Sequence, residues 1–149
     1  MKWIDIPPVW LAGALGLSWA QARFVPLGLS WPWPVVDFFA GLLIGGGLVL
    51  IALAVFEMRK QGTTVVPHQK ADTLVTTGIF KRSRNPIYLA DTMILLGVSV
   101  LWDAVLAIAL VPIFLWIIEK RFVIDEENRL RVQFRERFAR YCQNTRRWI

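Results

Sequence analysis

The feature that most constrains the fold of this chain is a long stretch without any charge. Residues 38–56 contain only apolar side chains and glycine, and a helix of roughly 20 apolar residues is what the hydrocarbon core of a bilayer requires. Of all residues, 56% are hydrophobic and 19% are charged, whereas soluble domains average about 45–50% apolar and about 25% charged residues. We therefore expect the chain to fold in a membrane.

Three further uncharged runs, residues 6–22, 92–102 and 104–118, predict additional membrane helices. A proline pair opens the first run, and proline is favoured in the first turn of a helix. The other two runs are short, and only Asp103 separates them. They predict a tight helical hairpin. One long helix is the alternative, which the charge of Asp103 and the total length disfavour.

The hairpin reaches spanning length only if its first arm begins near Pro86 and its second extends past Ile118. Asp91 then lies inside the membrane, where an acidic residue is a candidate functional group. We expect it to contact a substrate amine or to pair, by snorkelling, with Lys81 or Arg82. The predicted fold class is all-α: four transmembrane helices, the last two a hairpin, and a C-terminal amphipathic helix on the cytoplasmic side.

The positive charges predict the orientation of these helices. The chain has 17 Lys and Arg residues, and all but Lys2 and Arg23 lie between the second and third runs or after the fourth. Because cytoplasmic connections carry excess positive charge, we expect both termini and the polar segments on the cytoplasmic side of the inner (plasma) membrane. This topology, with attraction to anionic lipid, accounts for the net charge of +6 without nucleic-acid binding.

Residues 1–149 are expected to form one membrane-embedded domain, with two spans in residues 1–57 and the polar loop, hairpin and tail in residues 58–149. No strand is predicted, which excludes a Rossmann domain. Gly45, Gly46 and Gly47 lie within an expected span, where glycines allow close helix packing. With one cysteine, Cys142, and one histidine, His68, we expect no intramolecular disulfide and no metal site built from Cys or His.

The polar segment before the third run ends in a predicted anion site. Asn85 and Pro86 pair a favoured N-cap residue with a proline at the first helical position, so a helix is expected to begin at Pro86. Its free N–H groups, with Lys81, Arg82 and Arg84 just before them, suit a carboxylate or a phosphate. The alternative is that these cations only anchor the helix to lipid headgroups.

From Val123 onward, apolar residues recur at helical spacing and predict an amphipathic tail helix. Glu127 falls on the apolar stripe and Glu126 lies at its edge. Burying an unpaired carboxylate costs several kcal/mol, so Glu127 needs a partner. A helix lying at the membrane surface is the simpler alternative, but it leaves the buried acid unexplained. The stripe consists of Val123, Glu127, Leu130, Phe134, Phe138 and Tyr141.

Three motifs follow one another in residues 67–149. They read Leu74-Val75-x-Thr77-Gly78-x-Phe80, Arg84-Asn85-Pro86-x-Tyr88-Leu89, and Glu126-Glu127-x-x-Leu130-x-x-x-Phe134-x-x-x-Phe138-x-x-Tyr141. In this order they resemble the integral-membrane methyltransferases, which include isoprenylcysteine carboxyl methyltransferases and phospholipid N-methyltransferases. The chain departs from many members at Asn85, Arg135 and Phe138, where those have histidine, glycine and tyrosine.

The resemblance implies S-adenosylmethionine as methyl donor and S-adenosylhomocysteine as product, bound between the last membrane helices and the tail. The donor's carboxylate is expected at Arg84 and the start of the helix, and its ammonium or ribose hydroxyls at Glu126 or Glu127. Adenine is expected beside Tyr88 and the backbone of residues 74–75. The complete set implied for cofactor binding is His68, Leu74, Val75, Thr77, Gly78, Arg84, Asn85, Pro86, Tyr88, Leu89, Glu126 and Glu127.

The expected reaction is an in-line methyl transfer to a membrane amphiphile, in which the protein mainly aligns the reactants. For a phospholipid headgroup amine, the first choice of substrate, Glu127 is the candidate proton acceptor and Asp91 the candidate substrate contact. For an ionised nucleophile, Arg84 would position it. The alternatives are carboxyl methylation of an isoprenylcysteine-type substrate, S-methylation of a small thiol and, in another class, a non-catalytic scaffold that binds anionic lipid.

Overall fold

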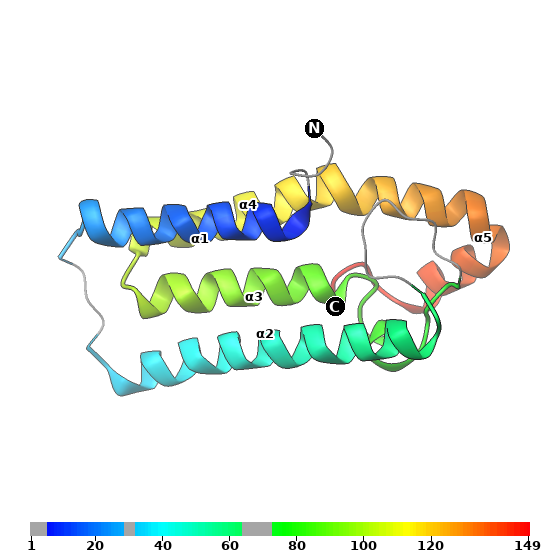
Figure 1. Cartoon of the computed structure of the whole chain (residues 1–149), viewed down its shortest axis with the longest axis horizontal. Coiled ribbons are helices and arrows are strands. Elements are labelled where there is room, and N and C mark those ends of the chain that lie inside the picture. The colour runs from blue at the N-terminus through cyan, green and yellow to red at the C-terminus, as the bar shows by residue number, and fades with distance from the viewer. Residues whose placement is uncertain (1–5, 29–31, 64–72) are drawn as a thin grey trace.

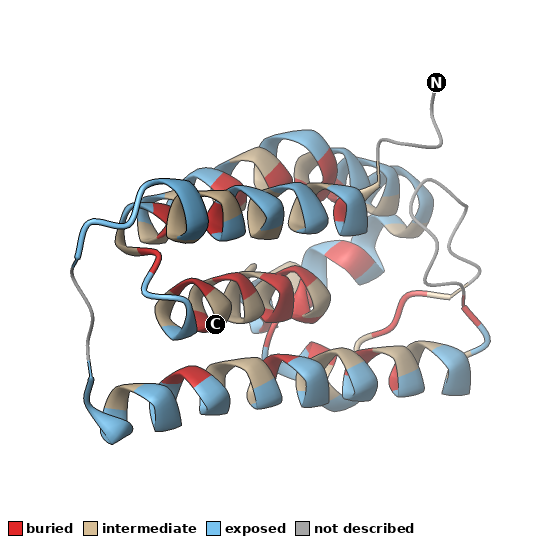
Figure 2. Ribbon diagram, turned by 60° about the vertical axis from the view of Figure 1, so that its left-hand side comes forward, coloured by how far each residue is buried: buried red, intermediate tan, exposed pale blue. Residues whose placement is uncertain are grey.

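The computed structural model describes residues 6–28, 32–63 and 73–149, and all regular secondary structure in these ranges is helical. The helices α1 to α4 lie side by side, and α5 continues beyond their ends (Figure 1). Helix α3 contacts α1, α2 and α4, and buried residues are concentrated on it (Figure 2). The elements are α1 (Pro7–Phe24), α2 (Pro34–Lys60), η1 (Gly78–Lys81), α3 (Pro86–Leu101), η2 (Val105–Ala109), α4 (Leu110–Ile118), η3 (Glu119–Val123) and α5 (Ile124–Asn144).

Prolines begin three of these helices, at Pro7, Pro34 and Pro86. Proline suits this position because its φ is already helical and its missing N–H would have no partner in the first turn. The predicted helix start at Pro86 is confirmed. The predicted side-chain cap is wrong: Asn85 precedes the helix, but its amide donates to the backbone carbonyl of Arg147 at 3.2 Å instead of accepting from the first turn.

The hairpin between α3 and α4 is confirmed, and one continuous helix is excluded. Asp103 has a φ of 53°, a left-handed conformation that aspartate tolerates better than most residues. The chain reverses there, and the 3₁₀-helical turns of η2 lead into α4. A single π-helical turn, η3, then joins α4 to α5.

By length and composition, α2 is the one helix of the described residues that could cross a membrane unaided, and α3 is a shorter apolar helix. Much of the outer surface of α2 is apolar and exposed, including Phe38, Leu42, Leu53 and Phe56. Contact with the acyl chains of lipids would cover this apolar surface. Four membrane crossings go beyond this observation and stay a prediction.

Helices α2 and α3 pack at the positions of two glycines. A Cβ atom on Gly97 would lie 2.8 Å from the carbonyl oxygen of Ala40, and one on Gly47 would lie 2.9 Å from that of Ala90. The two backbones therefore approach more closely than a side chain allows, as is common where helices associate in membranes. The expectation of close packing is confirmed at Gly47, whereas Gly45 faces open space.

Gly97→Ala should lower the thermal stability of the purified protein in detergent, by about 1–3 kcal/mol. The added methyl group would overlap a backbone oxygen of α2, which cannot move without shifting the helix. Gly45→Ala is the matched control, and it should keep or slightly raise the stability because nothing lies near the new methyl group. Equal melting temperatures for the two variants would contradict this account of the contact.

The tail forms two helical parts that meet at Arg135, which has a φ of 43° and a ψ of −114°. The predicted stripe is confirmed in its burial, because Glu127, Phe138 and Tyr141 are buried and Phe134 packs against the cluster that contains Phe138 and Tyr141. The helical spacing predicts one uninterrupted tail helix, and this prediction is wrong at Arg135. The bend turns the second part of α5 back toward the end of the bundle where α2 ends and α3 begins (Figure 1).

Arg135→Gly should stabilise the protein by about 1 kcal/mol, because glycine adopts a positive φ without steric cost. Arg135→Ala, which removes the same charge and retains Cβ, should bring no such gain. Thermal unfolding in detergent compares the two. A lower stability for the glycine variant than for the alanine variant would show that the bend is not strained.

Candidate functional site

The end of the chain folds back against the start of α3 (Figure 1). The backbone N–H of Arg84 donates to the carbonyl of Arg146 at 3.1 Å. The hydroxyl of Ser83 and the side-chain amide of Asn85 both donate to the carbonyl of Arg147, at 3.3 and 3.2 Å. Residues 145–149 are thereby fixed beside the predicted anion site, and they become part of its wall.

Glu127 lies between two arginines at this point. Its Oε1 accepts from Nη2 of Arg84 at 3.0 Å and from Nε of Arg147 at 3.1 Å, and its Oε2 accepts from Nη2 of Arg147 at 2.7 Å. The side chain of Glu127 is only 8% exposed. Arg147 reaches further, since its Nη1 donates to Glu119 at 2.7 Å. The buried acid on the tail stripe therefore has the partners that its burial requires.

The ion pairs of this cluster favour the ionised forms of Glu127 and Arg147. Burial by itself raises the pKa of Glu127, but the hydrogen bonds from Arg147 and Arg84 outweigh it, and the net pKa lies below its usual value of 4.5. The hydrogen bond to Glu127 likewise raises the pKa of Arg147. Arg84, Arg147, Glu119 and Glu127 form a balanced set of two cations and two anions.

Arg84 also caps the C-terminal end of α5. Its Nη1 donates to the carbonyl of Thr145 at 2.6 Å and to that of Cys142 at 3.5 Å. A cation at a helix C-terminus is favourable, because the last carbonyl groups lack helical partners and carry partial negative charge. One side chain thus links the start of α3, the first half of the tail and its last turn.

Tyr88 and Asp91 occupy the face of α3 next to this cluster. The hydroxyl of Tyr88 donates to Glu126 at 3.3 Å, and both Tyr88 and Asp91 are buried, at 9% and 6% exposed. Asp91 follows Tyr88 by nearly one helical turn, so the two side chains lie on one face. Within the described ranges, Asp91 makes no hydrogen bond or ion pair.

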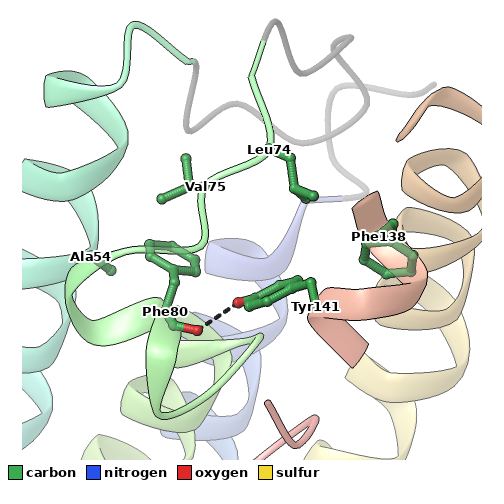
Figure 3. Packing of buried hydrophobic residues seen from close by; sticks show 6 residues of the cluster. All are labelled: Ala54, Leu74, Val75, Phe80, Phe138 and Tyr141. Carbon is green, nitrogen blue, oxygen red and sulfur yellow. Dashed lines mark hydrogen bonds between the residues drawn. The ribbon is translucent and has the colours of Figure 1, made fainter. Parts of the chain in front are cut away.

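The first motif builds the neighbouring wall. Leu74 and Val75 pack with Ala54, Phe80, Phe138 and Tyr141 in one apolar cluster, and the Tyr141 hydroxyl donates to the Phe80 carbonyl at 2.7 Å (Figure 3). Burial raises the pKa of Tyr141, so this hydroxyl remains a donor.

The chain turns at Thr77 and Gly78, where η1 begins. Gly78 has a φ of 58°, and a Cβ atom there would lie 2.6 Å from a carboxylate oxygen of Glu57. The hydroxyl of Thr77 donates to Glu57 and accepts from Gln61 at 3.2 Å. This contact attaches the turn to the end of α2.

Two open depressions flank the charged cluster. The first, of about 510 Å³, includes Leu74, Tyr141 and Thr145 and three cationic side chains, Lys81, Arg137 and Arg140. The second, of about 480 Å³, lies on the side of α1 and α4. The first is within the range of about 300–1,000 Å³ that small-molecule sites occupy.

The structure brings together most of the site residues expected from the second and third motifs. Arg84 contacts Glu127, Tyr88 contacts Glu126, and Asn85 and Pro86 are buried beside them. Leu89 is half-buried in the same first turn. Residues 74–78 form the adjacent wall and do not contact the acid pair through any hydrogen bond given by the structure. His68 lies outside the described residues.

Sequence reasoning missed Arg147, Glu119 and the returning chain end. A signal was present, because Glu119 and Glu127 are both acids of the tail region near its apolar stripe, and an arginine was available after the helix.

No group of three or more metal-ligating side chains occurs in the part of the chain that the structure describes.

Glu127→Gln should destabilise the protein by about 2–3 kcal/mol, because it leaves two arginines facing a neutral amide in a largely buried position. The pH dependence should change as well. A lowered carboxylate pKa gives stability that is present above pH 4.5 and is lost as the pH falls through the folded value. The wild type should therefore lose melting temperature below pH 4.5 more steeply than Glu127→Gln.

Glu136→Gln is the matched control. Its carboxylate is 89% exposed and reaches only Arg140, at 3.8 Å, so neither stability nor the pH profile should change measurably. If the two glutamine variants behave alike in detergent, the cluster at Glu127 does not hold the chain end.

Comparison with known families gives one match. A family model described as phospholipid methyltransferase matches residues 35–137. The match runs from the start of α2 into the second part of α5 and includes Arg84, Tyr88 and both tail acids, whereas Arg147 lies beyond it. No curated protein and no solved structure matches the chain.

Proposed function

Since the chain belongs to the phospholipid methyltransferase family, we propose that it transfers a methyl group from S-adenosylmethionine to the headgroup amine of a membrane phospholipid. The observation that carries this proposal is the meeting of the second and third motifs. Residues far apart in the sequence place Arg84 against Glu127 and Tyr88 against Glu126. These contacts bring acidic and basic groups to one end of the helical bundle.

The side chains present fit a zwitterionic methyl donor. Arg84, Arg147, Glu119 and Glu127 balance one another, so a ligand that carries both a carboxylate and an ammonium leaves that balance unchanged. Asp91 and Glu126 lie on the Tyr88 side and can face the additional positive charge of a sulfonium. When bound, S-adenosylmethionine supplies a methyl group that is activated by this sulfonium.

We assign the individual roles as follows. The first-turn N–H groups of α3 and Arg84 hold the carboxylate, and Glu126, oriented by the Tyr88 hydroxyl, holds the ammonium or the ribose hydroxyls. Leu74, Val75 and the depression that reaches Thr145 accept the adenosine part, with Thr77, Gly78, Asn85, Pro86 and Leu89 shaping the surrounding walls.

Proton removal separates the roles of two acids. An amine must be unprotonated to act as a nucleophile. Glu127 has a lowered pKa and two arginine partners, so it binds a proton weakly near neutral pH, and we assign it to positioning Arg84. Asp91 is buried without a hydrogen-bond partner among the described residues, and a cationic headgroup offsets the cost of that burial. We assign Asp91 to hold the headgroup ammonium and to accept the proton that the nitrogen loses before it attacks the methyl group.

The proposed setting is a single domain, residues 1–149, with four spans in the inner membrane and both termini in the cytoplasm. The positively charged segments just before α3 and after α4 lie at one end of the bundle, together with the site. This arrangement agrees with the rule for cytoplasmic loops. A lipid substrate can then reach the site laterally from the bilayer, at headgroup depth.

Purified protein in detergent should bind S-adenosylhomocysteine, as measured by isothermal titration calorimetry. Arg84→Ala should weaken binding by about 1.5–3 kcal/mol, the usual worth of a hydrogen bond to a charged group. Arg131→Ala, at an exposed position of α5, should leave it unchanged, and melting temperatures confirm that each variant is folded. A wild-type protein that binds no S-adenosylhomocysteine is the result expected of a lipid-binding scaffold, and it would overturn the proposal.

The substrate is identified by incubating membranes with donor labelled in its methyl group and extracting lipids, proteins and volatile compounds separately. Label in the lipid fraction, on an amine headgroup, is the expected result. Label in the protein fraction would instead support carboxyl methylation of an isoprenylcysteine, and label in the volatile fraction would support methylation of a small thiol.

A further inference from the structure

The second depression, of about 480 Å³, lies between the start of α1 and the junction of α4 with α5. Trp10, Trp116 and Ile117 form its apolar part, and Lys120, Arg121 and Asp125 form its polar part. The guanidinium carbon of Arg121 lies 5.3 Å from the centre of the Trp10 ring, a cation–π arrangement that orients the arginine. We call these six residues the junction groove.

The junction groove combines features of the boundary between hydrocarbon and headgroups. Trp116 lies in the last turns of α4 and is 63% exposed, and tryptophan is favoured at this depth of a membrane. Lys120 and Arg121 follow Trp116 by four and five positions and are also exposed. They belong to the π-helical turn η3, an irregularity that occurs frequently at functional sites.

The groove adjoins the proposed reaction site from the membrane side. Trp10 packs against the apolar cluster that contains Tyr88 and Phe122. Asp125 precedes Glu126, which accepts the hydrogen bond from Tyr88. Through this cluster, Trp10 connects the groove to the face of α3 that carries Tyr88.

We propose that the junction groove binds the phosphate of the phospholipid whose amine is methylated, with Lys120 and Arg121 as its cationic partners. This inference rests on the proposed function. Two cations and one carboxylate leave a net charge of +1, which complements the single negative charge of a phosphodiester. The exposed ring of Trp116 and the half-buried ring of Trp10 lie along the beginning of the acyl chains.

The occupant is a lipid rather than a soluble phosphate because the groove is half apolar and continues into the exposed apolar surface of α4, which includes Ile113. A carboxylate substrate would bind the same cations, but it has no headgroup to occupy the rest of the groove. Nonspecific attraction of anionic lipid to Lys120 and Arg121 is the competing explanation. It predicts that replacing these two residues does not change the KM for the substrate lipid.

The test is methyl transfer in mixed micelles as a function of the mole fraction of phosphatidylethanolamine. Lys120→Gln and Arg121→Gln should each raise the KM for this lipid about ten-fold, with kcat and the affinity for S-adenosylhomocysteine unchanged. Arg131→Gln removes the same charge from an exposed position on α5 and should leave all three quantities unchanged. An unchanged KM for the junction-groove variants, or an equal rise for Arg131→Gln, would overturn the inference.

A second lipid separates phosphate recognition from general lipid contact. A diacyl amine that lacks the phosphate should have a higher KM than phosphatidylethanolamine with the wild type, and this difference should shrink in Lys120→Gln and Arg121→Gln. Soluble glycerophosphoethanolamine should compete only weakly, because it lacks the acyl chains. Strong competition by it would show that the groove recognises a soluble phosphate compound.

Failure of the proposed function is distinguishable from failure of this inference. If the wild type neither binds S-adenosylhomocysteine nor transfers a methyl group, native mass spectrometry still measures whether it retains phosphatidylethanolamine in preference to diacylglycerol. Retention that depends on Lys120 and Arg121 would support the phosphate site, and retention that ignores both substitutions would overturn it.

Discussion

The carboxylate of Glu127, held between Arg84 and Arg147, is the interaction on which the rest of the site depends. It joins three segments that are distant in the sequence: the start of α3, the first half of the tail, and the last residues of the chain. A buried carboxylate with one cation would remain poorly compensated. The second arginine completes the compensation, and the backbone carbonyls that accept from Arg84 fix the chain end as a wall of the site.

The membrane supplies the other constraint. Helices in lipid gain little from the hydrophobic effect between them, so they associate through close packing and buried polar contacts. Both occur around α3: its backbone approaches that of α2 at Gly97, and Ser99 shares a hydrogen bond of 3.0 Å with Ser18 of α1. Helix α3 is thereby fixed on two sides, which gives Tyr88 and Asp91 a defined position at the end of the bundle that carries the charged cluster.

Residue patterns predicted the helices and their ends well, because uncharged runs, Pro86 and the single charge at Asp103 are local signals. They predicted the apolar tail stripe, with Glu127 on it, for the same reason. They could not reveal that Asn85 would hold the chain end, since that contact joins residues 62 positions apart.

The bend at Arg135 and the role of Arg147 escaped prediction for related physical reasons. Arginine is a good helix former, so the residue type at position 135 does not predict a positive φ. Arg147 lies after the predicted helix, where sequence periodicity gives no information. Its partner Glu127 showed only that some cation was required.

The most direct measurement of the central claim is hydrogen–deuterium exchange of the protein in detergent with and without S-adenosylhomocysteine. If the charged cluster encloses the methyl-donor site, exchange should slow together in the first turn of α3, around residues 126–127 and in residues 145–148. A saturating ligand that protects none of these segments, or protects only one and leaves the other two unchanged, would contradict the account.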